Sequence, residues 1–112
     1  MPGFMTIILV LFVSSGLLLA AVARPLMLRK VQPNSLYGFR VRKTLEDPKV
    51  WYDANEFAGK CMFRSGVATA LACAILYFVS SDPLSYVWDC VAIAMCGLAL
   101  SLFLSFRFLK RC

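Results

Sequence analysis

Residues 33–59, PNSLYGFRVRKTLEDPKVWYDANEFAG, are the only long polar run in this chain, and they decide how the rest of it folds. Long apolar segments lie before and after this run. Apolar segments can cross a bilayer as helices, whereas a charged run of this length has to stay in contact with water. We therefore expect the run to be a connection outside the bilayer, with membrane-spanning helices on either side.

The composition indicates an integral membrane protein. Hydrophobic residues make up 61% of the 112 residues and charged residues only 16%, and the mean hydropathy is +0.75. A soluble protein of this size could not cover its surface with so few polar side chains. We predict a single all-α membrane domain, residues 1–112, with three transmembrane helices. A cytoplasmic interfacial loop and an amphipathic helix are expected between the first two spans.

Three apolar segments match the thickness of a bilayer, at about residues 4–28, 61–80 and 84–106. About 20 helical residues, each rising 1.5 Å, cross a hydrocarbon core of about 30 Å. Pro25 need not end the first helix, which can continue beyond a kink. Asp82-Pro83, before the third segment, is typical of a helix start.

A cleaved signal peptide is the alternative interpretation of the first apolar segment, because Ala21-Val22-Ala23 resembles a cleavage site. We favour a retained span for three reasons. No basic residue precedes the apolar run, the run is longer than the usual signal core of about 7–15 residues, and Arg24, Arg29 and Lys30 follow it directly.

The polar run, with its flanks at about residues 31–60, contains signals for turns and for a helix. Tyr37-Gly38-Phe39 places a flexible residue between two aromatic rings, which suits a bend whose rings enter the headgroup layer. Asp47-Pro48 predicts a helix start with Asp47 as N-cap, and Thr44 offers an alternative start one turn earlier. We expect this interfacial helix to run into the second span.

Trp51, Asn55 and Gly59 recur at four-residue intervals and therefore share one face of the predicted helix. We expect this face to pack against the Tyr37–Arg40 turn and to form a small folded cap under the bundle. Trp51 is expected at the membrane interface, where tryptophan is favoured. Asn55 would form hydrogen bonds, and Gly59 would allow a neighbouring segment to approach closely.

The distribution of charge predicts the topology. Nine of the twelve Lys and Arg residues lie between Arg24 and Arg64, and the other three are at the C-terminal end. The turn between the second and third spans carries only Asp82, with Asp89 nearby. The positive-inside rule then places the central loop and the C-terminus in the cytoplasm and the N-terminus outside.

The residues that most metal sites and enzymes need are missing or scattered. There is no histidine, and the five cysteines form no Cys-x-x-Cys pair, so we expect no metal, no cofactor and no enzymatic activity. Asp53 and Glu56 could bind a cation, but we favour solvated charges on a polar helix face. Asp89 lies too close to its helix start to suit a proton-coupled transporter.

Arg40, Arg42 and Lys43 form a basic group with two interpretations. They can set the topology and contact anionic lipids, or Arg40 can bind a phosphate or carboxylate as part of an anion site. The lipid bilayer is the expected partner in either case, and binding of nucleic acid is not expected.

The polar run resembles the signature of the SdpI family, a group of bacterial multi-pass membrane proteins. The resemblance covers about residues 25–80 and includes the preceding Pro25-Leu26 and Leu28–Val31. The chain departs from the family pattern at Gln32 and at Val41-Arg42, which affects the shape of the turn. The positions that carry the resemblance are Pro33, Asn34, Tyr37, Gly38, Phe39, Arg40, Thr44, Trp51, Ala54, Asn55 and Gly59.

The resemblance implies immunity to, or sensing of, a membrane-active peptide toxin or a lipid-linked ligand in the bacterial plasma membrane. It also implies a peptide toxin or a regulatory protein of a signalling pathway as a partner. A small transporter or flippase subunit, a structural partner of another membrane protein and a homo-oligomer stay open as alternatives. The expected functional or fold-defining residues are Asn34, Tyr37, Gly38, Phe39, Arg40, Thr44, Trp51, Asn55 and Gly59.

Roles can be assigned to these residues as hypotheses. Arg40 would clamp an anion or a partner, Tyr37 and Trp51 would form walls at the interface, and Asn34 and Asn55 would lock the loop through hydrogen bonds. The alternative is that the whole motif only folds the loop.

Overall fold

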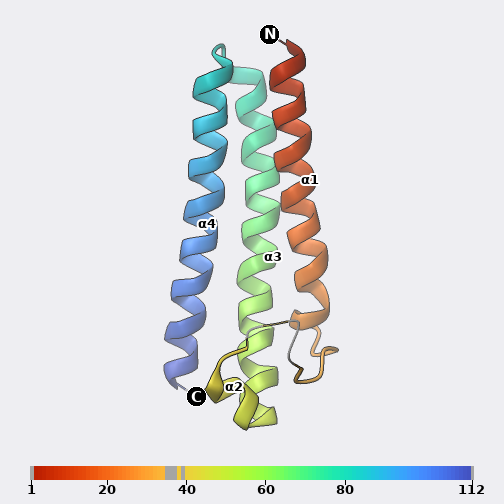
Figure 1. Cartoon of the computed structure of the whole chain (residues 1–112), viewed down its shortest axis with the longest axis vertical. Coiled ribbons are helices and arrows are strands. Elements are labelled where there is room, and N and C mark those ends of the chain that lie inside the picture. Colours follow the sequence, from red (N-terminus) through yellow and green to blue (C-terminus); the bar gives the residue numbers. More distant parts are fainter. Residues whose placement is uncertain (1, 35–37, 39, 112) are drawn as a thin grey trace.

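The computed structural model describes residues 2–34, 38 and 40–111, which form four helices and, over these residues, no strand. The helices are α1 (Pro2–Met27), the short α2 (Arg42–Glu46), α3 (Pro48–Val79) and α4 (Pro83–Arg111). Helices α1, α3 and α4 run side by side with α3 in the middle, and α2 lies near the start of α3 (Figure 1). The predicted all-α fold is confirmed.

The three long helices are each apolar and long enough to cross a membrane. Many of their large hydrophobic side chains point away from the bundle. Leu18, Ile75 and Phe103, one from each helix, are 65%, 64% and 62% exposed. Side chains of this kind are stable against lipid rather than water, so the chain is a multi-pass membrane protein.

Helix α3 combines the predicted interfacial helix and the second span. Its 32 residues give a length of about 48 Å, more than the bilayer core of about 30 Å, so the helix is long enough to contain both. The Asp47 carboxylate accepts the backbone N–H of Lys49 at 3.0 Å, with Pro48 in the first turn, as predicted. The alternative start at Thr44 is wrong, because Thr44 belongs to α2.

Helix α1 continues through Pro25, as predicted, and ends at Met27. Arg29 follows in the left-handed conformation, with φ of 61°. The N–H of Lys30 donates to the Pro25 carbonyl at 3.0 Å, and the N–H of Arg29 donates to the Leu26 carbonyl at 3.2 Å. These bonds make a Schellman ending, in which glycine usually occupies the position of Arg29.

Glycines bring α1 and α3 into backbone contact. A Cβ on Gly16 would lie 2.5 Å from the carbonyl oxygen of Gly66, and a Cβ on Gly59 would lie 2.8 Å from the backbone nitrogen of Met27. Membrane helices associate through small residues because these allow close van der Waals packing. The two contacts are seven residues apart on α3, so close packing of α1 on α3 extends over at least about two helical turns.

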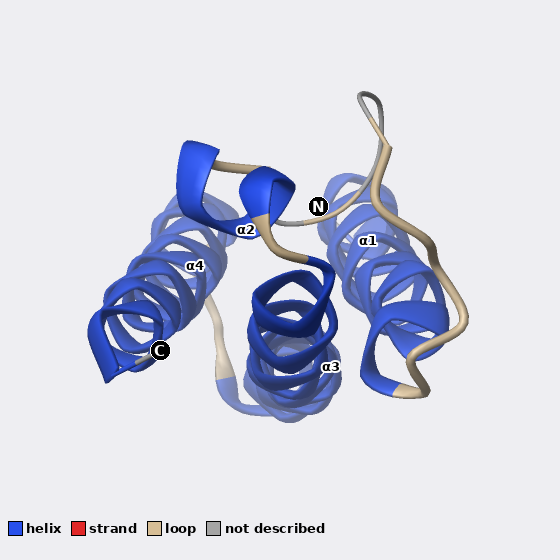
Figure 2. Cartoon of the chain, turned by 90° about the horizontal axis from the view of Figure 1, so that it is seen from below, coloured by secondary structure: helices blue, strands red, loops and turns tan. Residues whose placement is uncertain are grey.

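Helix α4 packs on α3 and has few contacts with α1. Seen from the α2 end, α1 and α4 lie on either side of α3 (Figure 2). At the opposite end, α1, α3 and α4 share a buried cluster of Met5, Cys73, Tyr86 and Cys90. There the Tyr86 hydroxyl donates to the Cys73 carbonyl at 2.8 Å. The Asp82 carboxylate caps α4 by accepting the N–H of Leu84 at 3.3 Å.

Candidate functional site

The polar segment folds into a cap at one end of the bundle. We define the cap as residues 28–34, 38 and 40–47, which include helix α2, together with the first three turns of α3. It lies at the end of the molecule where α1 stops and where the C-terminus also lies (Figure 1). Tyr37 and Phe39, two of the predicted site residues, fall outside the described residues.

Trp51 connects the first turn of α3 to the loop after α1. Its side chain is fully buried, and the indole N–H donates to the carbonyl of Val31 at 2.8 Å. The prediction that Trp51 anchors the chain in the headgroup layer is wrong, because its ring is enclosed by protein. A buried indole N–H needs a partner, and the loop carbonyl provides one.

Asn55 and Gly38 complete this buried unit. The Asn55 amide is 2% exposed and donates to the Trp51 carbonyl at 2.9 Å. Gly38 has a φ of 108°, and a Cβ there would lie 2.8 Å from the Asn55 Oδ1 and 3.1 Å from the Trp51 ring. Glycine is therefore required both by the backbone conformation and by the available space. At Gly38, the expected packing of the turn on this helix face is confirmed.

Gly59 belongs to a different contact. Its nearest neighbours are the backbone atoms of Ala23 and Met27 and the side chain of Leu26, all on α1. The expectation that Gly59 admits a close neighbour is confirmed. The expectation that it packs on the Tyr37–Arg40 turn is wrong, since the neighbour is the end of the first span.

Two further predicted residues form short-range bonds within the loop. The buried Thr44 hydroxyl accepts the N–H of Val41 at 3.0 Å and lies 2.9 Å from the Val41 carbonyl. The Asn34 side chain donates to the Gln32 carbonyl at 2.7 Å. Both residues stabilise turns at the edges of the polar run, which matches the expected lock for Asn34.

Arg40 differs from the other described residues of the expected functional set, because it alone among them is exposed. It lies beside a hollow that α1, α3 and α4 also line. Lys43, three residues further, donates its ammonium group to the carbonyl of Leu109 at 2.8 Å and so fastens α2 to the end of α4. Within the basic group, Lys43 thus holds α2 to α4, Arg42 pairs with Glu46 on α2, and Arg40 is an exposed residue beside the hollow.

A charged cluster that the sequence analysis missed lies on another side of the cap. The Arg29 guanidinium donates to Asp53 Oδ1 and to Glu56 Oε2, both at 2.9 Å, and lies 5.4 Å from the centre of the Tyr52 ring. The hydrogen bond to Asp53, followed by that to Glu56, raises the pKa of Arg29 above its ordinary value. Asp53 and Glu56 are therefore not simply solvated charges, because they hold the turn after α1 against α3.

The signal for this cluster was the three-residue spacing of the two carboxylates on one helix. The spacing does not reveal the cationic partner, because Arg29 reaches the carboxylates through the unusual ending of α1, where it occupies a position at which glycine is common. Within the part of the chain that the structure describes, no three His, Cys, Asp or Glu side chains are grouped to hold a metal ion.

Comparisons with known proteins place this cap in a family. The family model described as the SdpI/YfhL protein family matches residues 30–106, which include most of the cap, α3 and most of α4. The chain is also 38% identical over 37 residues to the protein YfhL of Bacillus subtilis (strain 168), covering 33% of this chain and 34% of that relative. The match thus spans about a third of the relative's length. No solved structure matches the chain.

Proposed function

The chain belongs to the SdpI/YfhL protein family, and on that premise we propose that it gives immunity to, or senses, a membrane-active peptide toxin or a lipid-linked ligand. The proposal involves no catalysed reaction. One observation points to a particular residue: among the described residues of the expected functional set, only Arg40 is exposed. The half-buried Gly38 and the buried Trp51 and Asn55 shape the turn, whereas Arg40 lies at the surface, where a ligand can reach it.

We further propose that the cap faces the cytoplasm and that the N-terminus lies outside the cell. The cap contains Arg29, Lys30, Arg40 and the basic residues of α2, and α4 ends nearby with Arg107, Lys110 and Arg111. The turn between α3 and α4 at the other end carries Asp82. This distribution supports the orientation through the positive-inside rule.

A toxin-challenge assay tests the proposed immunity. The gene is deleted and then restored as wild type, as Arg40→Ala or as Arg42→Ala, and survival is scored against membrane-active peptides, including any encoded nearby. Arg42 is a matched control because its side chain is 91% exposed and paired with Glu46, four residues along α2. Equal accumulation of the three proteins is verified by quantitative blotting of membranes.

We expect the deletion to sensitise cells to a particular peptide, with rescue by the wild type and Arg42→Ala but not by Arg40→Ala. A deletion that changes sensitivity to no peptide would contradict the proposal. Substrate flux in liposomes would then favour a transporter, and co-purification with one dominant protein would favour a structural partner. Loss of accumulation in Arg40→Ala would instead assign the motif to folding.

A further inference from the structure

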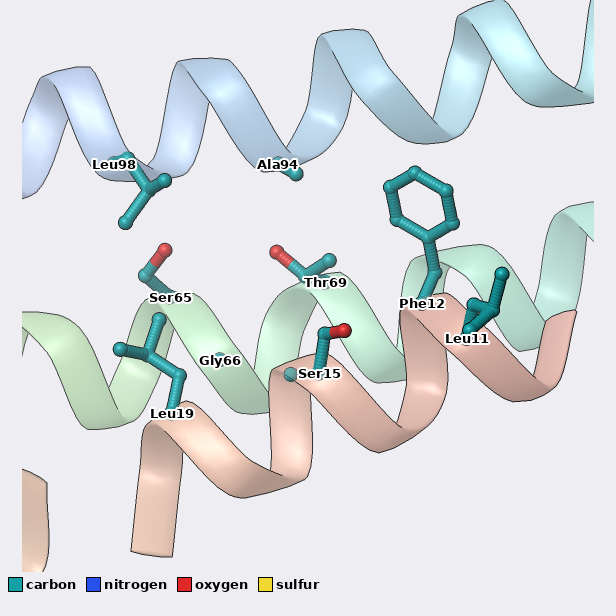
Figure 3. A pocket seen from close by; sticks show the side chains of 10 residues that line it. Leu11, Phe12, Ser15, Leu19, Ser65, Gly66, Thr69, Ala94 and Leu98 are labelled. Carbon is teal, nitrogen blue, oxygen red and sulfur yellow. The ribbon is translucent and has the colours of Figure 1, made fainter. Parts of the chain in front are cut away.

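A groove runs between α1 and α4 across one face of α3; we name it the α1–α4 groove. It consists of two hollows, of about 290 and 490 Å³, that share Leu19 of α1 and Leu98 of α4. Hollows of roughly this size hold small-molecule ligands in many proteins. Figure 3 shows the hollow farther from the cap, where the Phe12 ring extends toward α4 and the Ser15 and Thr69 hydroxyls face the space.

The walls of the groove are mostly apolar and belong to the membrane-spanning helices. Val22, Leu26, Met62 and Leu102 supply alkyl surface in the hollow next to the cap. Ser101 also lines it, but its hydroxyl donates to the Gly97 carbonyl of its own helix at 2.9 Å. Apolar walls without a contacting neighbour lose dispersion energy, and water there would find few hydrogen-bonding partners. A hydrocarbon chain is the occupant that suits these walls.

The cap end of the groove carries positive charge. Arg40 lines it together with Gly38 and Ser105, and Arg107 and Lys110 border the adjoining surface of α4. The carboxylates of the cap bond to groups other than Arg40. Glu46 pairs with Arg42, Asp47 caps α3, and Asp53 and Glu56 bind Arg29. A ligand in the groove would therefore meet cations where the hydrocarbon walls end.

We propose that the α1–α4 groove binds one acyl chain of an anionic phospholipid, with the phosphate of the lipid against Arg40. The planar guanidinium of arginine matches two phosphate oxygens at once, and basic residues at a membrane surface attract anionic headgroups. The inference rests on the groove and its charge, not on the proposed immunity. It assigns Arg40 a lipid ligand that is present whether or not a toxin is met.

The test uses the full-length protein in nanodiscs made from equal amounts of phosphatidylglycerol and phosphatidylcholine. Native mass spectrometry then measures which lipids stay bound after release. We expect the wild type to retain one phosphatidylglycerol in preference to phosphatidylcholine. Arg40→Gln should reduce this preference about tenfold, because a charge-assisted hydrogen bond is lost, while Arg42→Gln, which removes the same charge outside the groove, should preserve it.

A second variant tests the groove without changing charge. Leu98→Trp places a large ring between the two hollows, and we expect it to abolish retention of the lipid while circular dichroism shows unchanged helix content. Three results would overturn the proposal. The wild type could retain the two lipids equally, Arg40→Gln and Arg42→Gln could reduce the preference equally, or Leu98→Trp could retain the lipid fully. A lipid-free oligomer would also overturn it and assign the groove to a second copy of the chain. No toxin is present in this lipid-binding experiment, so a negative result does not contradict the proposed immunity. A negative toxin-challenge assay likewise does not contradict lipid binding in the groove.

Discussion

The indole N–H of Trp51 donates to the carbonyl of Val31 across 2.8 Å, and 20 residues of chain separate the two. This bond closes the loop between the first span and α3. Gly38 lies against the Trp51 ring and the Asn55 amide within that loop. Gly38, Trp51 and Asn55, none of which carries a charge, thus shape the turn that holds the exposed Arg40.

Replacing Trp51 by phenylalanine should loosen the cap. The Val31 carbonyl would lose its partner, and we expect a cost of about 1–3 kcal/mol in the free energy of unfolding. The measurement is thermal unfolding in detergent, combined with limited proteolysis of the cap. The second tryptophan offers the control: Trp88 is 66% exposed, so Trp88→Phe should leave both readouts unchanged. Equal effects of the two substitutions would contradict a buried Trp51.

Gly38→Ala should destabilise the cap by about 1–3 kcal/mol, because alanine resists a positive φ and strained backbone carries a cost of this size. Its Cβ would also meet the Asn55 Oδ1 at 2.8 Å. Gly3→Ala is the control, since a Cβ there meets nothing within 4 Å. Thermal unfolding compares the two variants. A Gly38→Ala protein as stable as Gly3→Ala would show that the turn tolerates a side chain.

The interaction of Arg29 with Asp53 should be measurable and sensitive to salt. A double-mutant cycle with Arg29→Gln and Asp53→Asn isolates the coupling from the effect of each change. The side chains are 41% and 35% exposed, so raising the salt from about 50 mM to about 500 mM should weaken the coupling by screening. A coupling that stays constant with salt would contradict an exposed ion pair. Since the pKa of Arg29 is raised, its charge is retained at every pH below its already high ordinary value, and its own titration adds no pH dependence near neutrality.

The local parts of the fold could be predicted from sequence because their signals lie within a few residues. Asp47-Pro48 and Asp82-Pro83 each place a cap beside the helix that it starts, and the long apolar runs match the bilayer. The four-residue spacing of Trp51, Asn55 and Gly59 predicted one shared face. The spacing does not specify which neighbour each residue contacts, and Gly59 contacts α1 rather than the expected turn.

The parts that sequence could not provide depend on how distant segments meet. Arg29 reaches Asp53 because α1 ends with Arg29 in a left-handed conformation. Glycine, and sometimes asparagine, is typical of that conformation, so an arginine there gives no signal in the sequence. The burial of Trp51 likewise depends on the path of the loop after α1. The α1–α4 groove lies between two helices that both pack on α3 and have few contacts with each other, an arrangement that hydropathy does not encode.

The glycine contacts predict a difference between the two helix pairs. At Gly66, a Cβ would clash with the Gly16 carbonyl oxygen and lie 3.0 Å from the backbone nitrogen of Ala20. Both atoms belong to the backbone of α1, so relieving the clash would require α1 itself to shift. At Gly97, a Cβ would instead meet the Ser65 hydroxyl, which can rotate away. We expect Gly66→Ala to lower the unfolding temperature clearly and Gly97→Ala to change it little. The opposite order would mean that α4, rather than α1, is packed most closely on α3.

The proposed orientation predicts which residues a membrane-impermeant thiol reagent reaches in intact cells. In a variant without native cysteines, Ser81→Cys places a thiol in the exposed turn between α3 and α4, and Lys49→Cys places one on the exposed surface of the cap. With basic residues retained in the cytoplasm, the reagent should label Ser81→Cys in intact cells and Lys49→Cys only after the membrane is permeabilised. Permeabilised cells also serve as the control that both thiols are reactive. The reverse pattern would place the cap outside the cell, where Arg40 would face an arriving peptide directly, and labelling of both sites in intact cells would indicate a mixed orientation.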